Sequence, residues 1–221
     1  GASTESGIPD FRSANGLYAD AKVEMYLSRG YYNRNPKEFW KHYKAIFQID
    51  TFHQYKPNEG HTFLAQLEQT GKDIVVLTQN IDGLHQRAGN TNVLELHGSI
   101  IRIKCTVCDF QDEIKSSFDS LPPNCKCGSI LRPDVVWFGE PLPQDVWQEA
   151  IDHANSCDVM IISGTSLVVS PANTLPVYAG QNGATLIEVN PDETLMSRDM
   201  DLSIKTTSSV GLPKLLTYCR S

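Results

Sequence analysis

The chain has 221 residues, of which 40% are apolar and 20% are charged, and its formal net charge at pH 7 is -7. This length suits one globular unit, or a large domain with a small insertion, that buries a sizeable core. No stretch approaches the ~18 consecutive apolar residues of a membrane span, and no basic segment followed by an apolar one opens the chain. We therefore expect a cytoplasmic protein. The acidic charge argues against a general nucleic-acid or membrane surface and suits a basic partner.

The first twelve residues, Gly1 to Arg12, are rich in small and hydroxyl side chains and include a proline. This chemistry is typical of a loop whose backbone approaches a ligand closely. Nucleotide-binding folds place such a loop directly after their first strand, and no strand pattern precedes it here. We therefore expect the natural chain to start further upstream.

Two amphipathic helices are predicted next. The first covers residues 37–49, with Pro36 at its start. The second runs from Asn58 to Gln69, and Gly71 supplies its stop. The aromatic residues of the first helix share one face: Phe39, Trp40, Tyr43 and Phe47.

The centre of the chain joins a buried-strand pattern to a run of polar residues. The β-branched apolar run at 74–77 is typical of a parallel strand, and it stops at Thr78-Gln79-Asn80-Ile81-Asp82, with His85 and His97 following. Open α/β sheets bind ligands just beyond such strand ends, so this stretch predicts a site. The alternative is a capped turn, because Asn and Asp favour turns and a histidine is usually a packed or surface residue.

Four cysteines predict a metal site. Cys105 and Cys108 form a C-x-x-C pair, and Cys125 and Cys127 follow after a gap of sixteen residues. Pairs at this separation indicate tetrahedral Zn, whose structural sites are closed by sulfur ligands. A catalytic zinc is disfavoured because four thiolates leave no open position. The remaining alternative is four reduced cysteines without metal.

A β-α pattern follows the cysteines. An extended apolar run covers 130–140, a helix covers 145–155, and strands are predicted at 158–162, 184–189 and 202–205 before a terminal helix. Two of these strands are followed directly by small polar residues: Ser163-Gly164-Thr165-Ser166 and Asn190-Pro191. Strands that alternate with helices in this way indicate an α/β fold, a Rossmann-like doubly wound parallel sheet with a small zinc-binding module inserted.

These motifs, in this order, resemble the sirtuins, the NAD-dependent protein deacylases. The resemblance covers almost the whole chain and rests on Gly1-Ala2, Ser3 to Arg12, Thr78 to Asp82, Leu96-His97-Gly98, the four cysteines, Val136 to Glu140, Gly164 to Ser166 and Val189-Asn190. It implies a Rossmann domain that carries a smaller lobe, with NAD and an acyl-lysine peptide meeting between them. We expect the Rossmann domain at 1–23, 58–99 and 133–221, a helical segment at 24–57 and the zinc-binding module at 100–132.

The resemblance also implies a role for each motif. The cofactor-binding loop would contain Gly1, Ala2, Phe11 and Arg12. Gln79 and Asn80 would lie near the nicotinamide ribose, and Ile81 and Asp82 around the nicotinamide carboxamide. The phosphates and the adenosine ribose would be held by Gly164, Thr165, Ser166 and Asn190. The catalytic residues would be His97, as general base, and Asn80.

An extended peptide would add as a strand between two segments: Val136, Trp137, Phe138, Gly139 and Glu140 on one side, and residues 167–170, which include Leu167 and Val168, on the other.

The implied reaction suits these side chains. Nicotinamide leaves the ribose while the acyl-lysine oxygen attacks, which requires a dry, preorganised pocket rather than a strong nucleophile. A ribose hydroxyl then resolves the adduct, and an imidazole with an ordinary pKa of about 6.5, such as His97, can accept its proton. The products would be free lysine, nicotinamide and O-acyl-ADP-ribose. We expect acetyl-lysine proteins or peptides as substrates, a monomer, and no specific nucleic-acid binding.

The preferred acyl group is partly predictable. Sirtuins specialised for succinyl or malonyl groups resemble one another in a Tyr-x-x-Arg pair that holds the acyl carboxylate. The corresponding residues here are Tyr43-Lys44-Ala45-Ile46, so the arginine is missing. This favours acetyl or another uncharged acyl group.

Two places depart from the family pattern. The usual Gly-Ala-Gly-x-Ser appears as Gly1-Ala2-Ser3, and the second cysteine pair is one residue short. We expect residues to be absent from the printed sequence at both places. Normal Cα spacings of about 3.8 Å at Ala2-Ser3 and from Cys125 to Cys127 would refute this.

Other functions stay open. The same NAD site could transfer ADP-ribose to a protein side chain. Alternatively, the protein could be a non-enzymic NAD-responsive module that binds a partner through its zinc lobe. A nucleic-acid-binding ribbon is disfavoured, because the lysines near the cysteines are outnumbered by acidic residues.

Overall fold

The computed structural model describes residues 1–10, 16, 20–114, 118 and 120–218. Its helices are α1 (Ala21–Tyr26), α2 (Arg29–Arg34), α3 (Pro36–Phe47), α4 (Glu59–Gln69), α5 (Leu84–Ala88), α6 (Gln144–Ser156), α7 (Leu175–Gln181) and α8 (Ser208–Tyr218). Its strands are β1 (Val76–Thr78), β2 (Val93–Glu95), β3 (Gly98–Cys105), β4 (Gln111–Glu113), β5 (Leu131–Val135), β6 (Val159–Ser163), β7 (Thr185–Val189) and β8 (Leu202–Ile204).

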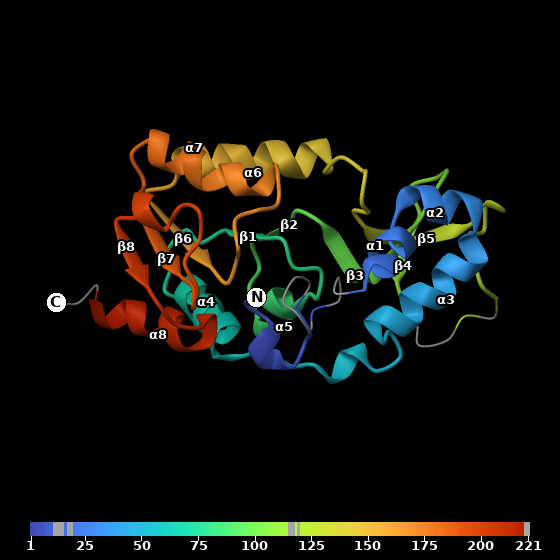
Figure 1. Ribbon diagram of the computed structural model, residues 1–221, viewed down its shortest axis with the longest axis horizontal. Coiled ribbons are helices and arrows are strands. Elements are labelled where there is room, and N and C mark those ends of the chain that lie inside the picture. Colours follow the sequence, from blue (N-terminus) through green and yellow to red (C-terminus); the bar gives the residue numbers. More distant parts are fainter. Residues whose placement is uncertain (11–15, 17–19, 115–117, 119, 219–221) are drawn as a thin grey trace.

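The larger part of the molecule is a layered α/β structure, as predicted. β1 pairs with β2, and β6, β7 and β8 form a second sheet, with every pairing parallel. α6 and α7 cover one side of these strands, and α4 and α8 cover the other (Figure 1). Among the described helices, none has both the length and the apolar character needed to cross a membrane.

The two predicted helices, α3 and α4, each begin with a residue that favours a helix N-terminus. Pro36 occupies the first turn of α3, where its missing N–H costs nothing. The Asn58 side chain accepts hydrogen bonds from the backbone N–H groups of Gly60 (3.0 Å) and His61 (3.4 Å), which caps α4. The predictions for 37–49 and 58–69 are therefore confirmed to within two residues.

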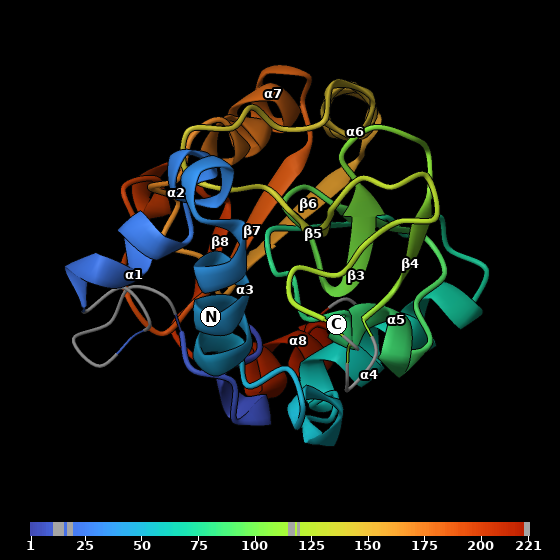
Figure 2. The same cartoon turned by 90° about the vertical axis from the view of Figure 1, so that its right-hand side faces the viewer.

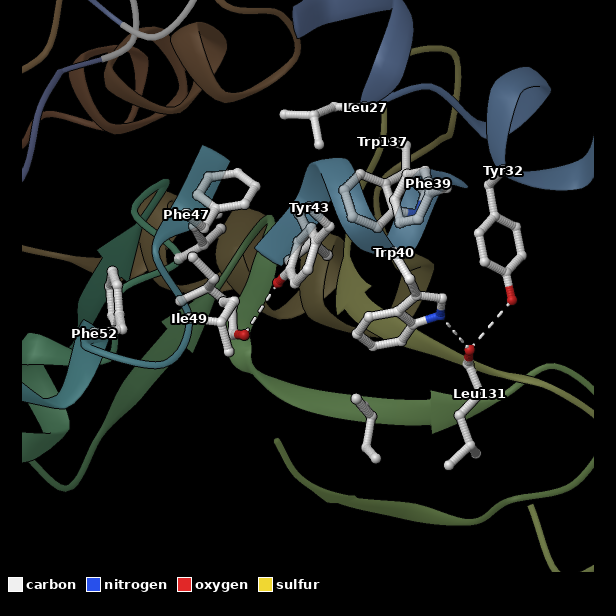
Figure 3. Packing of buried hydrophobic residues seen from close by; sticks show 14 of the residues in the cluster. Leu27, Tyr32, Phe39, Trp40, Tyr43, Phe47, Ile49, Phe52, Leu131 and Trp137 are labelled. Carbon is white, nitrogen blue, oxygen red and sulfur yellow. Dashed lines mark hydrogen bonds between the residues drawn. The ribbon is translucent and has the colours of Figure 1, made fainter. Parts of the chain in front are cut away.

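The smaller lobe packs the helices α1 to α3 against an antiparallel sheet with the order β4-β3-β5 (Figure 1, Figure 2). Trp40 and Tyr43 of α3 are fully buried, and their polar ends find backbone partners. Trp40 Nε1 donates to the Leu131 carbonyl oxygen at 3.1 Å, and the Tyr43 hydroxyl donates to that of Ile100 at 3.0 Å (Figure 3). One face of α3 is thereby fixed to both β3 and β5.

The first loop is bound to the last helix. The Thr207 hydroxyl donates to Glu5 Oε1 at 2.9 Å, and the backbone N–H of Ser209 donates to Glu5 Oε2 at 3.2 Å. A carboxylate at the start of α8 satisfies one of its free N–H groups and interacts favourably with the helix dipole.

Hydrogen-bonded turns span both places where the chain is shorter than the family pattern. The N–H of Thr4 donates to the Gly1 carbonyl at 3.2 Å, and the N–H of Gly128 donates to that of Cys125 at 3.0 Å. That residues are absent from the printed sequence stays a prediction.

Candidate active site

A cavity lies where the first loop, the residues after β1 and the smaller lobe meet. It combines apolar walls with a few polar groups, a composition typical of small-molecule sites. Its lining residues are Gly1, Ser3, Thr4, Ile8, Pro9, Asp10, Phe47, Phe52, Asn80, Ile81, Asp82 and Ile100. Four of the predicted cofactor residues are therefore together in it: Gly1, Asn80, Ile81 and Asp82.

The residues after β1 are held by their own short-range hydrogen bonds. The backbone N–H of Asn80 donates to Thr78 Oγ1 at 3.1 Å, and that of Leu84 donates to Asp82 Oδ1 at 2.9 Å, which starts α5. The Ile81 carbonyl accepts from the N–H of Ile100 at 2.8 Å. The capped-turn interpretation is thus correct for the backbone, and the same turn presents three side chains to the cavity.

His97 is half-buried and adopts a defined tautomer. Its Nδ1 lies 3.0 Å from the carbonyl oxygen of Gln79. A carbonyl can only accept, so Nδ1 carries the ring proton and Nε2 keeps its lone pair. Burial lowers the pKa of His97, while the hydrogen bond to Gln79 opposes this shift. The imidazole is therefore neutral near pH 7 and can accept a proton at Nε2.

The backbone around His97 is closely packed against the start of the segment predicted to bind the peptide. Gly98 has φ +76°, and a Cβ atom there would lie 2.1 Å from the carbonyl oxygen of Asp134. The N–H of Val136 donates to the His97 carbonyl at 3.0 Å. Only glycine allows this approach, which sets the position of His97 relative to residues 136–140.

The predicted phosphate loop lies against the first loop. Gly164 has φ +60°, and a Cβ atom there would lie 2.5 Å from the backbone nitrogen of Ala2. Gln79 Nε2 lies 3.5 Å from Thr165 Oγ1, which joins this loop to the residues after β1. Ser166 is exposed. Asn190 donates through Nδ2 to the Asp192 carbonyl at 2.8 Å, so its carboxamide is turned into its own loop.

Sequence reasoning missed a polar cluster behind the cavity. Ser3 Oγ accepts from Asn80 Nδ2 at 3.0 Å and lies 3.3 Å from His61 Nε2. The carboxamide of Asn58 reaches the Ala2 carbonyl at 2.8 Å. The only local signal was the Asn58-x-x-His61 spacing of a helix cap, which does not reveal that both side chains continue to the first loop.

His85 is a packed residue, in agreement with the capped-turn alternative. It is 8% exposed, and its ring centroid lies 4.7 Å from that of His61. Burial, with a smaller contribution from the neighbouring His61, lowers the pKa of His85 to about 4. It is thus uncharged near neutral pH, and it does not line the cavity.

The four cysteines come together as predicted. Cys105 Sγ lies 3.6 Å from Cys127 Sγ, Cys108 Sγ lies 3.6 Å from Cys125 Sγ, and the four sulfurs lie within 4.8 Å of one another. Ligands at about 2.3 Å from a tetrahedral Zn are about 3.8 Å apart, so the sulfur positions fit the metal. Backbone N–H groups of Cys108 and Val107 donate to the Cys105 sulfur at 3.4 Å and lower its pKa, with the bond from Cys108 contributing most. The C-x-C pair is therefore compatible with an all-sulfur zinc site.

The segment predicted to bind the peptide has alternating exposure. Val136 and Phe138 are half-buried and Gly139 is exposed, whereas Trp137 is 3% exposed and belongs to the core of the smaller lobe. The Glu140 carboxylate is bonded to Arg132. The side chains of Trp137 and Glu140 are thus used within the chain and are not available to a peptide.

On the opposite segment, Leu167 is buried with φ +53° and Val168 is 49% exposed. Val168 therefore has apolar surface available to a partner, whereas the Leu167 side chain does not. Phe11 and Arg12, predicted in the cofactor-binding loop, lie outside the described residues.

Parallel strands that end near a cavity, a neutral histidine bonded to Gln79, the residue before the lining residue Asn80, and a separate all-sulfur metal site define a nucleotide-using enzyme with a structural zinc module. A family model described as the Sir2 family matches residues 1–171. The chain belongs to the Sir2 family.

Relatives and solved structures agree with this assignment. An NAD-dependent protein deacetylase of Bacillus anthracis is 59% identical over 203 residues, which cover 91% of this chain and 83% of the relative. An NAD-dependent protein deacylase of Aquifex aeolicus is 43% identical, with coverage of 100% and 92%. A Sir2 homolog–NAD complex superposes with a TM-score of 0.88 at 40% identity and coverage of 99% and 86%. A Sir2–p53 peptide–NAD+ complex gives 0.82 at 36% identity and coverage of 99% and 90%.

Proposed function

We propose that this protein removes acetyl or another uncharged acyl group from lysine side chains of proteins and transfers it to ADP-ribose, releasing nicotinamide from NAD. Its class, an NAD-dependent protein deacylase, follows from its family and its named relatives. The observation that carries the residue-level proposal is the hydrogen bond of His97 Nδ1 to the Gln79 carbonyl, which leaves Nε2 free to accept a proton.

The cavity suits the nicotinamide end of the co-substrate. Asn80 and Asp82 supply polar groups, while Phe47, Phe52 and Ile100 supply apolar walls that exclude water. Gly164 and Thr165 would meet the phosphates with backbone N–H and hydroxyl groups. In this proposal the chain contributes binding, orientation and one proton acceptor, and no serine or cysteine nucleophile.

Nicotinamide release tests this function. We expect release from NAD to depend on an added acetyl-lysine peptide, with free lysine appearing in the peptide in equal amount. Mass spectrometry of the peptide separates the rivals: loss of the acetyl group identifies the deacylase, whereas a gain of ADP-ribose would identify a transferase. Release that is independent of any acyl peptide would refute the proposal.

The acyl preference gives a second prediction. The Tyr43 hydroxyl is bonded to the Ile100 carbonyl, and Ile46 is apolar, so neither supplies a cationic partner for a succinyl carboxylate. We expect kcat/KM to be at least tenfold higher for an acetyl than for a succinyl peptide, because an unpaired carboxylate would have to be desolvated.

The variant Ile46→Arg should raise kcat/KM for the succinyl peptide. Ala45, the preceding residue of α3, is exposed, so Ala45→Arg adds the same charge as a control. Equal gains from both variants, or a wild-type preference for succinyl, would contradict this assignment.

A further inference from the structure

One arginine holds both ends of the segment that we propose as the peptide-binding edge. Arg132 Nη1 donates to Glu140 Oε1 at 2.7 Å, and Nη2 donates to Glu140 Oε2 at 2.8 Å. Nη2 also donates to the Val135 carbonyl at 2.9 Å. Residues 135 and 140 flank the segment 136–139, so a single guanidinium fixes where it begins and where it ends.

The surroundings keep this arginine in one position. The Arg132 and Glu140 side chains are only 13% and 11% exposed. The guanidinium carbon lies 5.4 Å from the Trp137 ring centroid and 5.8 Å from that of Tyr32. A planar, weakly hydrated cation suits such a site between aromatic rings, and its fixed fork matches a carboxylate.

The Glu140 carboxylate also bonds to the backbone of the segment 136–139. Glu140 Oε2 accepts from the backbone N–H of Trp137 at 3.0 Å, and the N–H of Glu140 donates to the Trp137 carbonyl at 3.0 Å. Trp137 is thereby turned into the core, whereas Val136 and Phe138 are half-buried and Gly139 is exposed. The N–H of Val136 is bonded to the His97 carbonyl, so the same segment reaches the proposed base.

We infer that Arg132 is a positioning residue for the acylated peptide: by joining Glu140 to the Val135 carbonyl, it holds residues 136–139 as an edge that places the acyl-lysine beside His97. This inference rests on the proposed function. It assigns Arg132 no contact with NAD, because the predicted cofactor residues lie on other segments.

The test is the variant Arg132→Lys, which keeps the charge but cannot span three acceptors with fixed geometry. We expect the KM for an acetyl-lysine peptide to rise at least tenfold, while the KM for NAD at saturating peptide changes less than twofold. The dissociation constant of a labelled acetyl-lysine peptide in the presence of ADP-ribose, measured by fluorescence anisotropy, should rise by the same factor as the peptide KM.

Arg29 provides a matched control. Its Nε lies 3.8 Å from the same carboxylate oxygen, but its side chain is 61% exposed. Arg29→Lys should change the peptide KM less than twofold. A general loss of structure would instead raise both KM values or lower the melting temperature and the bound zinc together.

Glu140→Gln offers an independent variant if Arg132→Lys does not fold. It should raise the peptide KM selectively, and the double variant Arg132→Lys/Glu140→Gln should be less impaired than the product of the single effects. An unchanged peptide KM in Arg132→Lys, parallel changes in both KM values, or an equal effect of Arg29→Lys would overturn the inference. If the wild-type protein shows no peptide-dependent nicotinamide release, the proposed function fails instead.

Discussion

Replacing His97 with alanine should lower kcat for deacetylation by roughly 10²- to 10⁴-fold, the range that a positioned general base contributes. The proton acceptor Nε2 is lost, whereas the cavity residues Asn80, Ile81 and Asp82 remain in place. Peptide-dependent exchange of labelled nicotinamide into NAD should therefore persist, because nicotinamide leaves before the base is needed.

Two measurements make this result specific. Binding of ADP-ribose, followed by calorimetry, should change little in His97→Ala. His53 is exposed on the 3-10 turn Phe52–Gln54 and serves as the control, since His53→Ala removes an imidazole from the protein surface. A His97→Ala protein that retains more than half of the wild-type kcat would exclude this residue as the base.

Loss of the zinc site should have the largest effect on stability. We expect Cys105→Ser to lose one equivalent of zinc and to lower the melting temperature by more than about 10 °C, because structural zinc supplies folding free energy directly. Cys105 and Cys125 belong to the same buried cluster as Trp40 and Tyr43, so disorder at the metal reaches the core of the smaller lobe.

Zinc content by a colorimetric chelator and unfolding by circular dichroism check this prediction. Cys157→Ser is the matched control, because Cys157 is a free, partly buried thiol outside the cluster. A zinc-free Cys105→Ser protein with an unchanged melting temperature would show that the cysteine cluster is not structural.

Local patterns explain what the sequence predicted well. The aromatic face of α3, the bounds of α4 and the strand ends after β1 and β6 depend on neighbours within a few positions. The four cysteines could be grouped because the spacing rule for zinc already encodes their convergence. Gln79 and Thr165 each follow a predicted strand, and the structure brings Gln79 Nε2 to 3.5 Å from Thr165 Oγ1.

Long-range partners explain what was missed. Ser3 lies 58 positions from His61, and nothing near either residue reveals their contact. Val136, Trp137 and Phe138 are all apolar, so the sequence did not show that Trp137 alone would be buried. The sequence also did not show that the Glu140 carboxylate would be hydrogen-bonded to Arg132, since an acidic residue at the end of a strand can equally well be exposed to solvent.

The contact between Glu5 and α8 has a consequence for how the active site assembles. Its partners are separated by more than 200 positions, so closing this contact requires ordering nearly the entire chain. A ribosome synthesises α8 after every other described element, and until that helix docks, the loop that contains Gly1 and Ser3 lacks one of its anchors. The cavity should therefore be among the last parts of the nascent protein to reach its final shape, after the zinc lobe has formed. A chain whose synthesis stops before α8 would be partly folded but unable to bind its co-substrate.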